Sequence, residues 1–248
     1  MAQHQINEDY RPKLSRKSFI ARLRQFESRL QGNMESVFCP VHLCLGQEEV
    51  PALMYENLQD SDWVFSTHRA HGHYLAKGGS EQKLWDEIMG KESGVNGGFS
   101  GSQSFSDESV NFHCSAIVGG LVGAATGVAY ALKMDREKYQ SKAIAVCCVG
   151  DAATEAGVFW ESVNWAALNR LPIAYICENN EMSVDAHISE RQAMPISSRV
   201  ASFGLSVVSD VGAVFDLARG GSPAFCEVKT ELQCDHLNMA TMMPTGML

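Results

Sequence analysis

Asp151 and Asn180 are the two residues of this sequence whose types and spacing point most clearly to chemistry. Asp151 follows a continuous apolar run at residues 143–149, and Asn180 follows a second run at residues 172–177. Such runs are typical of strands that are buried on both faces of a sheet. Between them, residues 158–168 have the apolar spacing of a helix. The segment therefore predicts a strand–helix–strand crossover in which both strands are parallel.

A crossover of this kind brings Asp151 and Asn180 to the same edge of the sheet. The carboxyl ends of parallel strands border the crevice where open α/β sheets bind their ligands. A carboxylate and an amide oxygen suit a hard cation such as Mg2+, which in proteins often keeps phosphate oxygens among its ligands. The alternative is an ordinary crossover in which the aspartate caps a helix and Asn179-Asn180 forms a turn.

Residues 150–180 resemble the thiamine diphosphate motif, which begins Gly-Asp-Gly and closes on Asn-Asn. Within this segment, residues 150–161 resemble the alpha subunits of thiamine-dependent 2-oxo acid dehydrogenases, a family that includes the pyruvate, branched-chain and acetoin enzymes. The resemblance implies thiamine diphosphate and Mg2+ as cofactors. It makes Asp151, Asn180 and the backbone carbonyl of Met182 the metal ligands.

The same resemblance assigns five residues of the motif to cofactor binding: Gly150, Asp151, Ala152, Ala153 and Asn180. Ala152 departs from the family, which has a second glycine at this position. The N–H of Ala152 can still face the diphosphate, but its Cβ crowds that approach. We therefore expect weaker cofactor binding than is usual in the family.

The likeness extends over most of the chain through four further stretches in the same order, at residues 19–30, 42–49, 67–72 and 116–119. The second reads His-Leu-Cys-Leu-Gly-Gln-Glu-Glu where the family has His-Leu-x-x-Gly-Gln-Glu-Ala. The third reads Thr-His-Arg-Ala-His-Gly where the family has Tyr-Arg-x-His-Gly. Several motifs in one order support the same family.

Two of these stretches imply further cofactor contacts. A diphosphate carries more negative charge than one Mg2+ neutralises, so a cationic partner is expected. By the resemblance this partner is Arg69, with His68 standing in place of the family's tyrosine as a hydrogen-bond donor. The resemblance also implies that the backbone of Ala116 and Val118 holds the aminopyrimidine edge. The alternative for Arg69 is a surface salt bridge.

Three histidines are candidates for proton transfer or substrate binding, because imidazole changes charge near neutral pH. His42 and His71 lie within the matched stretches, where the alternative is a structural role in a loop. His236 resembles the histidine of the loop that follows the family's last strand. In that loop Leu232 occupies the position of an arginine, and the regulatory serine of some relatives is absent.

Residues 116–132 contain no charged residue and approach the lower length limit of a membrane-spanning helix. However, Gly119, Gly123 and Gly127 recur at every fourth position. This spacing predicts a smooth face on one helix, where a second backbone can approach closely. We therefore expect a helix that is buried at a subunit or core contact, and no membrane segment.

Composition limits the classes of partner and compartment. The 20 basic and 29 acidic residues give a net charge of −9, which argues against nucleic acid because no basic stripe could collect phosphates. The eight cysteines lack a Cys-x-x-Cys pair. They are expected to be small core residues in a reducing cytoplasm. The polar first residues also predict no secretory leader.

The organisation expected is a loose N-terminal arm at residues 1–15 and one α/β domain at residues 16–248 that lacks the family's C-terminal helices. Residues 92–108, which are rich in glycine and serine, predict a mobile loop. Further elements are expected as helices near residues 81–89, 197–203 and 213–219, and as strands near residues 115, 205–208 and 224–229.

The fold predicted is a doubly wound, mainly parallel α/β sheet that binds thiamine diphosphate. By the resemblance, the chain is the alpha-type subunit of a heterotetramer that decarboxylates a small 2-oxo acid. The acyl unit then passes to an acceptor, for which a lipoyl carrier is a candidate. A beta-type subunit would supply the carboxylate that activates the cofactor, so this chain alone should be incomplete.

Two alternatives remain open at this stage. A carboligase or a split transketolase-like enzyme would have the same cofactor site and a different acceptor. A non-catalytic partner subunit would keep the fold without turnover, and Ala152, Leu232 and the short C-terminal end favour this reading slightly.

Overall fold

The protein is built around a seven-stranded sheet, as described by a computed structural model that covers residues 14–234. The strand order is β2-β3-β1-β4-β5-β9-β8, and every neighbouring pair is parallel except β2 with β3. The strands of this sheet are β1 (Trp63–Ser66), β2 (Ser106–Asp107), β3 (Phe112–Cys114), β4 (Ala145–Gly150), β5 (Ile173–Asn179), β8 (Ser206–Val208) and β9 (Ala224–Lys229). A separate hairpin pairs β6 (Met182–Ser183) with β7 (Ala186–His187).

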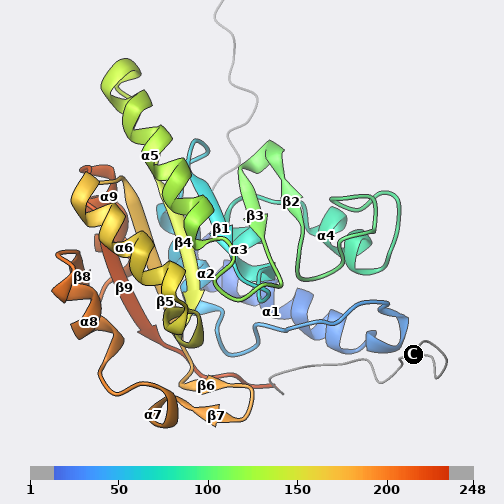
Figure 1. The fold of residues 1–248 in the computed structure, drawn as a ribbon. Helices are drawn as coiled ribbons and strands as arrows, with labels where there is room; N and C mark the ends of the chain where they lie inside the picture. The colour runs from blue at the N-terminus through green and yellow to red at the C-terminus, as the bar shows by residue number, and fades with distance from the viewer. Residues whose placement is uncertain (1–13, 235–248) are drawn as a thin grey trace, which may run out of the picture.

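Helices cover both faces of the sheet, because the central strands are apolar on both sides. In β4, Val146 and Cys148 belong to one hydrophobic cluster, whereas Ala145, Cys147 and Val149 belong to the other. The first cluster includes residues of α1 (Arg16–Gln31), α2 (Glu49–Asn57), α3 (His71–Ala76), α4 (Glu81–Ile88) and α9 (Val211–Arg219). The second includes residues of α5 (Val122–Tyr139), α6 (Gly157–Asn169) and α8 (Ile196–Ser202). Figure 1 shows α5 and α6 side by side in front of the sheet.

The doubly wound α/β fold predicted from the sequence is confirmed. The predicted crossover corresponds to β4, α6 and β5, and its two strands pair in parallel over their whole length. The expected elements in the last third are present as α8, β8, α9 and β9, and α4 is present as well. Several elements carried too weak a pattern to be expected, among them β1, the β6–β7 hairpin and α7 (Ile188–Arg191).

The glycine stripe differs from its prediction at one end. Gly119 lies before α5 in a turn, with a φ of 74°, so only Gly123 and Gly127 belong to the helix. The turn is closed by a hydrogen bond from the N–H of Gly120 to the carbonyl of Ile117. A positive φ is readily adopted by glycine, which explains why this position ends the stripe rather than extending it. Within the described residues, no helix has the length and apolar character needed to cross a bilayer.

A single buried carboxylate fixes part of the glycine- and serine-rich segment at residues 92–108. The sequence predicts a mobile loop for this segment. Glu87 accepts backbone hydrogen bonds from Asn96 and Gly98 on one oxygen and from Ser100 and Gly101 on the other. These donors lie 2.6–3.2 Å from the carboxylate. A charged acceptor with several N–H donors is a strong local constraint. The segment therefore has a defined path along the edge of the molecule.

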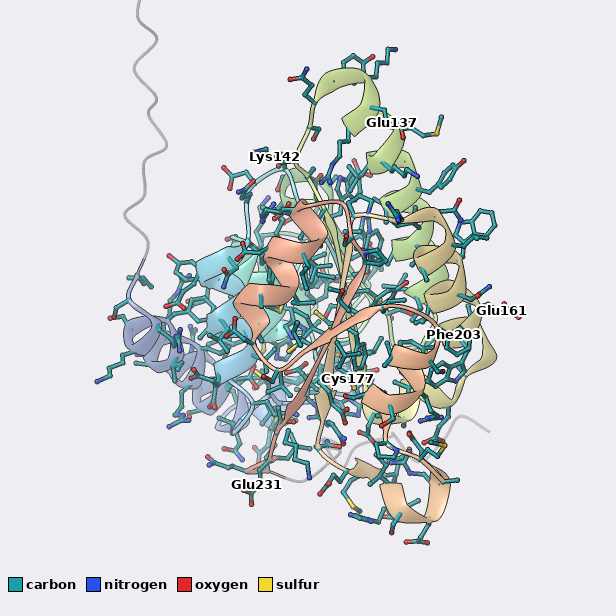
Figure 2. The ribbon with its side chains drawn as sticks, turned by 90° about the vertical axis from the view of Figure 1, so that its left-hand side faces the viewer. Glu137, Lys142, Glu161, Cys177, Phe203 and Glu231 are labelled. Carbon is teal, nitrogen blue, oxygen red and sulfur yellow. The ribbon has the colours of Figure 1, made fainter. Side chains whose placement is uncertain are left out.

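At the amino ends of the strands, Asp62 links three parts of the fold. Its carboxylate accepts hydrogen bonds from Arg219 at the end of α9, at 2.6 and 2.9 Å, and from the backbone N–H groups of Gln59 and Ile144. Asp62 is fully buried. In Figure 2, Lys142 marks this end of the molecule and Glu231 marks the opposite end, where the strands finish. Asp62 therefore lies far from the ligand edge of the sheet and has a structural role.

We expect Asp62→Ala to lower the free energy of unfolding by about 3–5 kcal/mol, because it leaves a largely buried arginine without its carboxylate. The matched control is Glu49→Ala, which removes an exposed ion pair with Arg16 and should cost about 0–1 kcal/mol. Urea unfolding followed by circular dichroism measures both. Equal unfolding midpoints for the two variants would show that the Asp62 pair does not hold these elements together.

Candidate functional site

A cavity of about 290 Å³ lies at the carboxyl ends of the central strands. The cavity lies where the direction of chain winding reverses. In the sheet, β1 and β4 are neighbours, with β3 on the other side of β1 and β5 on the other side of β4. The loops leaving β1 and β4 therefore separate and leave a crevice, which is the usual ligand position in this architecture. The volume is close to the lower end of the range for small-molecule sites.

The structure brings most of the predicted site residues into this one cavity. Its wall includes His42, His68, Arg69, Ala116, Val118, Gly150, Asp151, Ala152, Ala153, Asn180 and Met182. They come from five separate parts of the sequence, and the parallel strands explain how they meet. His71 is not in the wall, and His236 lies outside the described residues.

Asp151 opens a short 3-10 helix, η3 (Asp151–Glu155), directly after β4. Its side chain is almost fully buried and forms an ion pair with Arg191 of α7, with 2.6 Å between Oδ2 and Nη2. Burial raises the pKa of Asp151, and the hydrogen bond and charge of Arg191 oppose that rise. Arg191 also contacts Glu155. Arg191 donates to Oδ2 of this carboxylate. Within the described part of the chain, no other residue donates a hydrogen bond to Oδ1.

The two asparagines after β5 have different environments. Asn179 is buried, donates to Glu227 and accepts the N–H of Glu181, so it shapes the turn. Asn180 lines the cavity, and its Oδ1 accepts the N–H of Met182 at 3.1 Å. An amide oxygen has a second lone pair that remains available for a cation. Asp151, Asn180 and Met182 thus line the cavity together, and the first two bring side-chain oxygens to it.

Arg69 provides positive charge in the cavity wall although it is largely buried. Its Nη1 donates to the backbone carbonyl of Leu43, which orients the guanidinium. Burial lowers the pKa of Arg69, but an arginine remains charged at physiological pH. His68 is adjacent and packs edge-on against His42, with 4.5 Å between the ring centroids. The arrangement gathers a cation and two imidazoles around one part of the cavity.

The turn before α5 lines the cavity with residues 116–121. The N–H of Ala116 donates to Ser104 at 2.9 Å, so this group is already occupied. The side chains of Ile117 and Val118 are exposed although both residues line the cavity. Apolar side chains that are left exposed at the mouth of a ligand site indicate a site that something else completes.

His71 occupies a different environment from the one predicted for a proton carrier. It is fully buried, and both ring nitrogens are in hydrogen bonds, Nδ1 with Glu27 and Nε2 with Ser102, each at 2.7 Å. His68 and Arg69 of the same motif line the cavity, whereas His71, the first residue of α3, does not. His42, in contrast, lines the cavity and accepts a hydrogen bond from Gln103.

Several polar residues of the wall were given no role by the sequence, among them Gln47, Gln103 and Glu178. Gln47 is buried and donates to Thr230 at 2.6 Å, while its Oε1 has no partner among the described residues. Gln47 lies in the stretch at residues 42–49 that resembles the family, so the sequence could have indicated that it belongs to the site. Gln103 carried no such signal, because it lies in an irregular segment whose path depends on distant contacts. Arg191, which pairs with Asp151, was also missed.

Among the described residues there is no cluster of three or more histidine, cysteine, aspartate or glutamate side chains suited to a metal ion. The predicted ligand set has one carboxylate, one amide and one backbone carbonyl, so it would not form such a cluster. Oxygen ligands of this kind fit Mg2+ that takes its remaining ligands from phosphate and water. The donor chemistry of this set therefore fits the ion that the resemblance implies.

Comparison with known proteins identifies the family. Residues 18–208 match the family described as dehydrogenase E1 component. The chain is 32% identical over 230 residues to the alpha subunit of acetoin:2,6-dichlorophenolindophenol oxidoreductase of Bacillus subtilis, a match that covers 86% of this chain and 68% of the relative. It is 37% identical over 171 residues to the pyruvate dehydrogenase E1 alpha subunit of Rhizobium meliloti, covering 68% of this chain and 47% of the relative.

A third relative is the pyruvate dehydrogenase E1 alpha subunit of Zymomonas mobilis, which is 35% identical over 190 residues, or 74% of this chain and 52% of that protein. The matches span about half to two thirds of the length of these relatives. The matched region contains every residue that lines the cavity. The chain therefore belongs to the dehydrogenase E1 component family, as a member of its alpha-subunit type.

Proposed function

We propose that this protein is the alpha-type subunit of a thiamine diphosphate-dependent enzyme that decarboxylates a 2-oxo acid and transfers the acyl unit to an acceptor. One observation carries the proposal: a single cavity at the carboxyl edge of the sheet gathers the oxygen ligands, the buried cation and the histidine that this chemistry requires. Membership of the E1 family supports the cofactor and the general reaction.

The part of the cavity lined by Asp151, Asn180 and Met182 would hold Mg2+ and the diphosphate. Asp151 and Asn180 supply side-chain oxygens, and Met182 supplies a backbone carbonyl. The ion pair with Arg191 opposes the rise in the pKa of Asp151 that burial causes, and it leaves Oδ1 for the cation. A Cβ added at Gly150 would have no atom within 4 Å, so there is open space in front of this backbone. Arg69 and His68 would neutralise the remaining negative charge of the diphosphate.

The rest of the cavity would hold the reacting groups. Thiamine diphosphate supplies the carbanion chemistry of this reaction, and the protein supplies positioning, electrostatics and protons. The backbone of Ala116 and Val118 would hold the aminopyrimidine edge. His42 would transfer a proton or orient the oxo acid, since it lines the cavity and imidazole titrates near neutral pH. The same family resemblance gives this role to His236.

A beta-type subunit would complete the site. An alpha subunit of the E1 type implies such a partner, and we propose that it supplies the carboxylate that activates the cofactor. The exposed side chains of Ile117 and Val118 at the mouth of the cavity are consistent with a surface that the partner covers. A lipoyl carrier or another acceptor would receive the acyl unit.

The proposed reaction is tested with the full chain purified together with a beta-type subunit from the same source. We expect dye reduction with 2,6-dichlorophenolindophenol that depends on a 2-oxo acid, on thiamine diphosphate and on Mg2+. Asp151→Ala should raise the half-saturating concentration of thiamine diphosphate by about a hundredfold or more, because the loss of a metal's supporting groups alone costs 10- to 100-fold.

The matched control is Asp185→Ala, which removes the same charge from an exposed position near the cavity and should leave the saturation curve unchanged. Pyruvate, a branched-chain 2-oxo acid and acetoin are offered separately. Turnover of acetoin alone would contradict the 2-oxo acid assignment. Equal saturation curves for Asp151→Ala and the control would contradict the metal-ligand assignment.

A second surface supports the partner proposal. Gly123 and Gly127 of α5 are exposed, and a Cβ at Gly127 would have no atom within 4 Å. Tyr130 of α5 lies 6.3 Å from Trp165 of α6, centroid to centroid, and both are exposed. Leu168, also on α6, is 73% exposed. These residues expose apolar surface on two packed helices, and an apolar patch on a protein surface often marks an interaction site.

The variant Gly127→Leu distinguishes an effect on the stability of the chain from an effect on its assembly with the partner subunit. Leucine is a better helix former than glycine by roughly 0.5–1 kcal/mol, and open space surrounds this position, so the isolated chain should not be destabilised. Against another subunit, the added side chain would prevent close approach of the backbones, which typically costs about 1–3 kcal/mol. We therefore expect an unchanged or higher melting temperature for the chain alone and loss of the assembly formed with the beta-type subunit.

Analytical ultracentrifugation with the beta-type subunit measures the assembly. The control is Gln25→Leu, which places the same side chain on the exposed face of α1. Identical assembly of Gly127→Leu and the control would place the subunit contact elsewhere on the molecule.

A further inference from the structure

A buried carboxylate links two segments that both reach the cavity. Glu27, in the middle of α1, is fully buried. Its Oε2 accepts the backbone N–H of Cys44 at 2.8 Å, and its Oε1 lies 2.7 Å from Nδ1 of His71. An ionised carboxylate has no hydrogen to donate. In its contact with Glu27, Nδ1 of His71 is therefore the donor. One side chain thereby fixes the segment that contains His42 and the start of α3.

His71 extends the link to the irregular segment before β2. In the neutral ring with its hydrogen on Nδ1, Nε2 is the acceptor, and the hydroxyl of Ser102 donates to it at 2.7 Å. Ser102, like Glu27 and His71, is fully buried. The three side chains resemble the order of a serine–histidine–acid triad, but none of them lines the cavity, so no substrate reaches the serine hydroxyl.

The two segments meet again in the cavity wall. Gln103, the residue after Ser102, places Nε2 at 2.5 Å from Nδ1 of His42, which is two residues before Cys44. The contacts form a closed ring: Glu27 holds Cys44, His42 contacts Gln103, and Ser102 returns to Glu27 through His71. Such a ring leaves little freedom for the two side chains that face the ligand.

We propose that Glu27, His71 and Ser102 are positioning residues that hold the amide of Gln103 as a donor to Nδ1 of His42, and so fix the tautomer of His42. When Nδ1 accepts a hydrogen bond, the neutral ring carries its proton on Nε2. The inference deepens the proposed function, on which the role of His42 rests. The tautomer itself can be measured without cofactor, partner subunit or turnover.

The test uses the full chain labelled with 15N-histidine, observed by NMR at a pH where the imidazole is neutral, with the His42 signals assigned by comparison with His42→Gln. Wild-type His42 should show an unprotonated Nδ1 and a protonated Nε2. Ser102→Ala releases Gln103 from the ring and should give a mixture of the two tautomers. Ser100→Ala is the matched control, since its hydroxyl lies two residues away and outside the ring; this variant should keep the wild-type tautomer.

Gln103→Leu provides a second variant that leaves the buried contacts of Glu27, His71 and Ser102 in place. It removes the donor directly and should also give a mixture, which keeps the test valid if Ser102→Ala fails to fold. A wild-type spectrum with the proton on Nδ1 would overturn the proposal. The wild-type tautomer in both Ser102→Ala and Gln103→Leu would overturn it as well.

An activity measurement adds two readouts, kcat and the half-saturating concentration of the cofactor. A purely structural role of Ser102 would not separate these two quantities. In the assembly with the beta-type subunit, Ser102→Ala should lower kcat by about 10- to 100-fold, the scale expected from a small misplacement of a reacting group. The half-saturating concentration of thiamine diphosphate should stay unchanged. If the proposed function fails and no turnover is found, the tautomer result still decides this inference.

Discussion

The site depends on one electrostatic constraint, the neutralisation of Asp151 at the end of β4. A carboxylate with 2% residue exposure is costly to bury unless a cation compensates it, and Arg191 supplies that cation at 2.6 Å. Arg191 is the last residue of α7, which follows the β6–β7 hairpin. The pair therefore also determines where the hairpin lies, and with it the position of Met182 and the cavity wall. In the proposed enzyme, one oxygen of this carboxylate pairs with Arg191 and the other would bind the metal.

The fold supports this constraint through strands that pack on both faces. Successive residues of β4 enter opposite hydrophobic clusters, so the strand cannot shift by one residue without exposing apolar side chains and burying the wrong ones. The carboxyl end of β4, and therefore Asp151, is fixed in position. The irregular segments around the cavity lack this support from strands. They rely instead on buried carboxylates, Glu87 for the segment before β2 and Glu27 for the segment with His42.

The sequence was informative where the signal is local. The crossover could be predicted because both strands and the helix have clear patterns within about forty residues, and that crossover already placed Asp151 and Asn180 together. Contacts between distant segments could not be predicted. Arg191 reaches Asp151 across 40 positions, and Gln103 reaches His42 across 61. The motif around His71 indicated a residue of the site, but packing decides where the imidazole lies, and His71, the first residue of α3, is buried outside the cavity wall.

The central claim, that the cavity holds a metal–diphosphate group between Asp151 and Asn180, is tested most directly by locating the metal. A crystal of the chain with its beta-type subunit, thiamine diphosphate and Mn2+ would reveal the ion by its anomalous scattering. We expect one peak bonded to a carboxylate oxygen of Asp151 and the amide oxygen of Asn180, with Arg191 still paired to the other oxygen. An ordered cofactor whose metal lies away from both side chains would contradict the account.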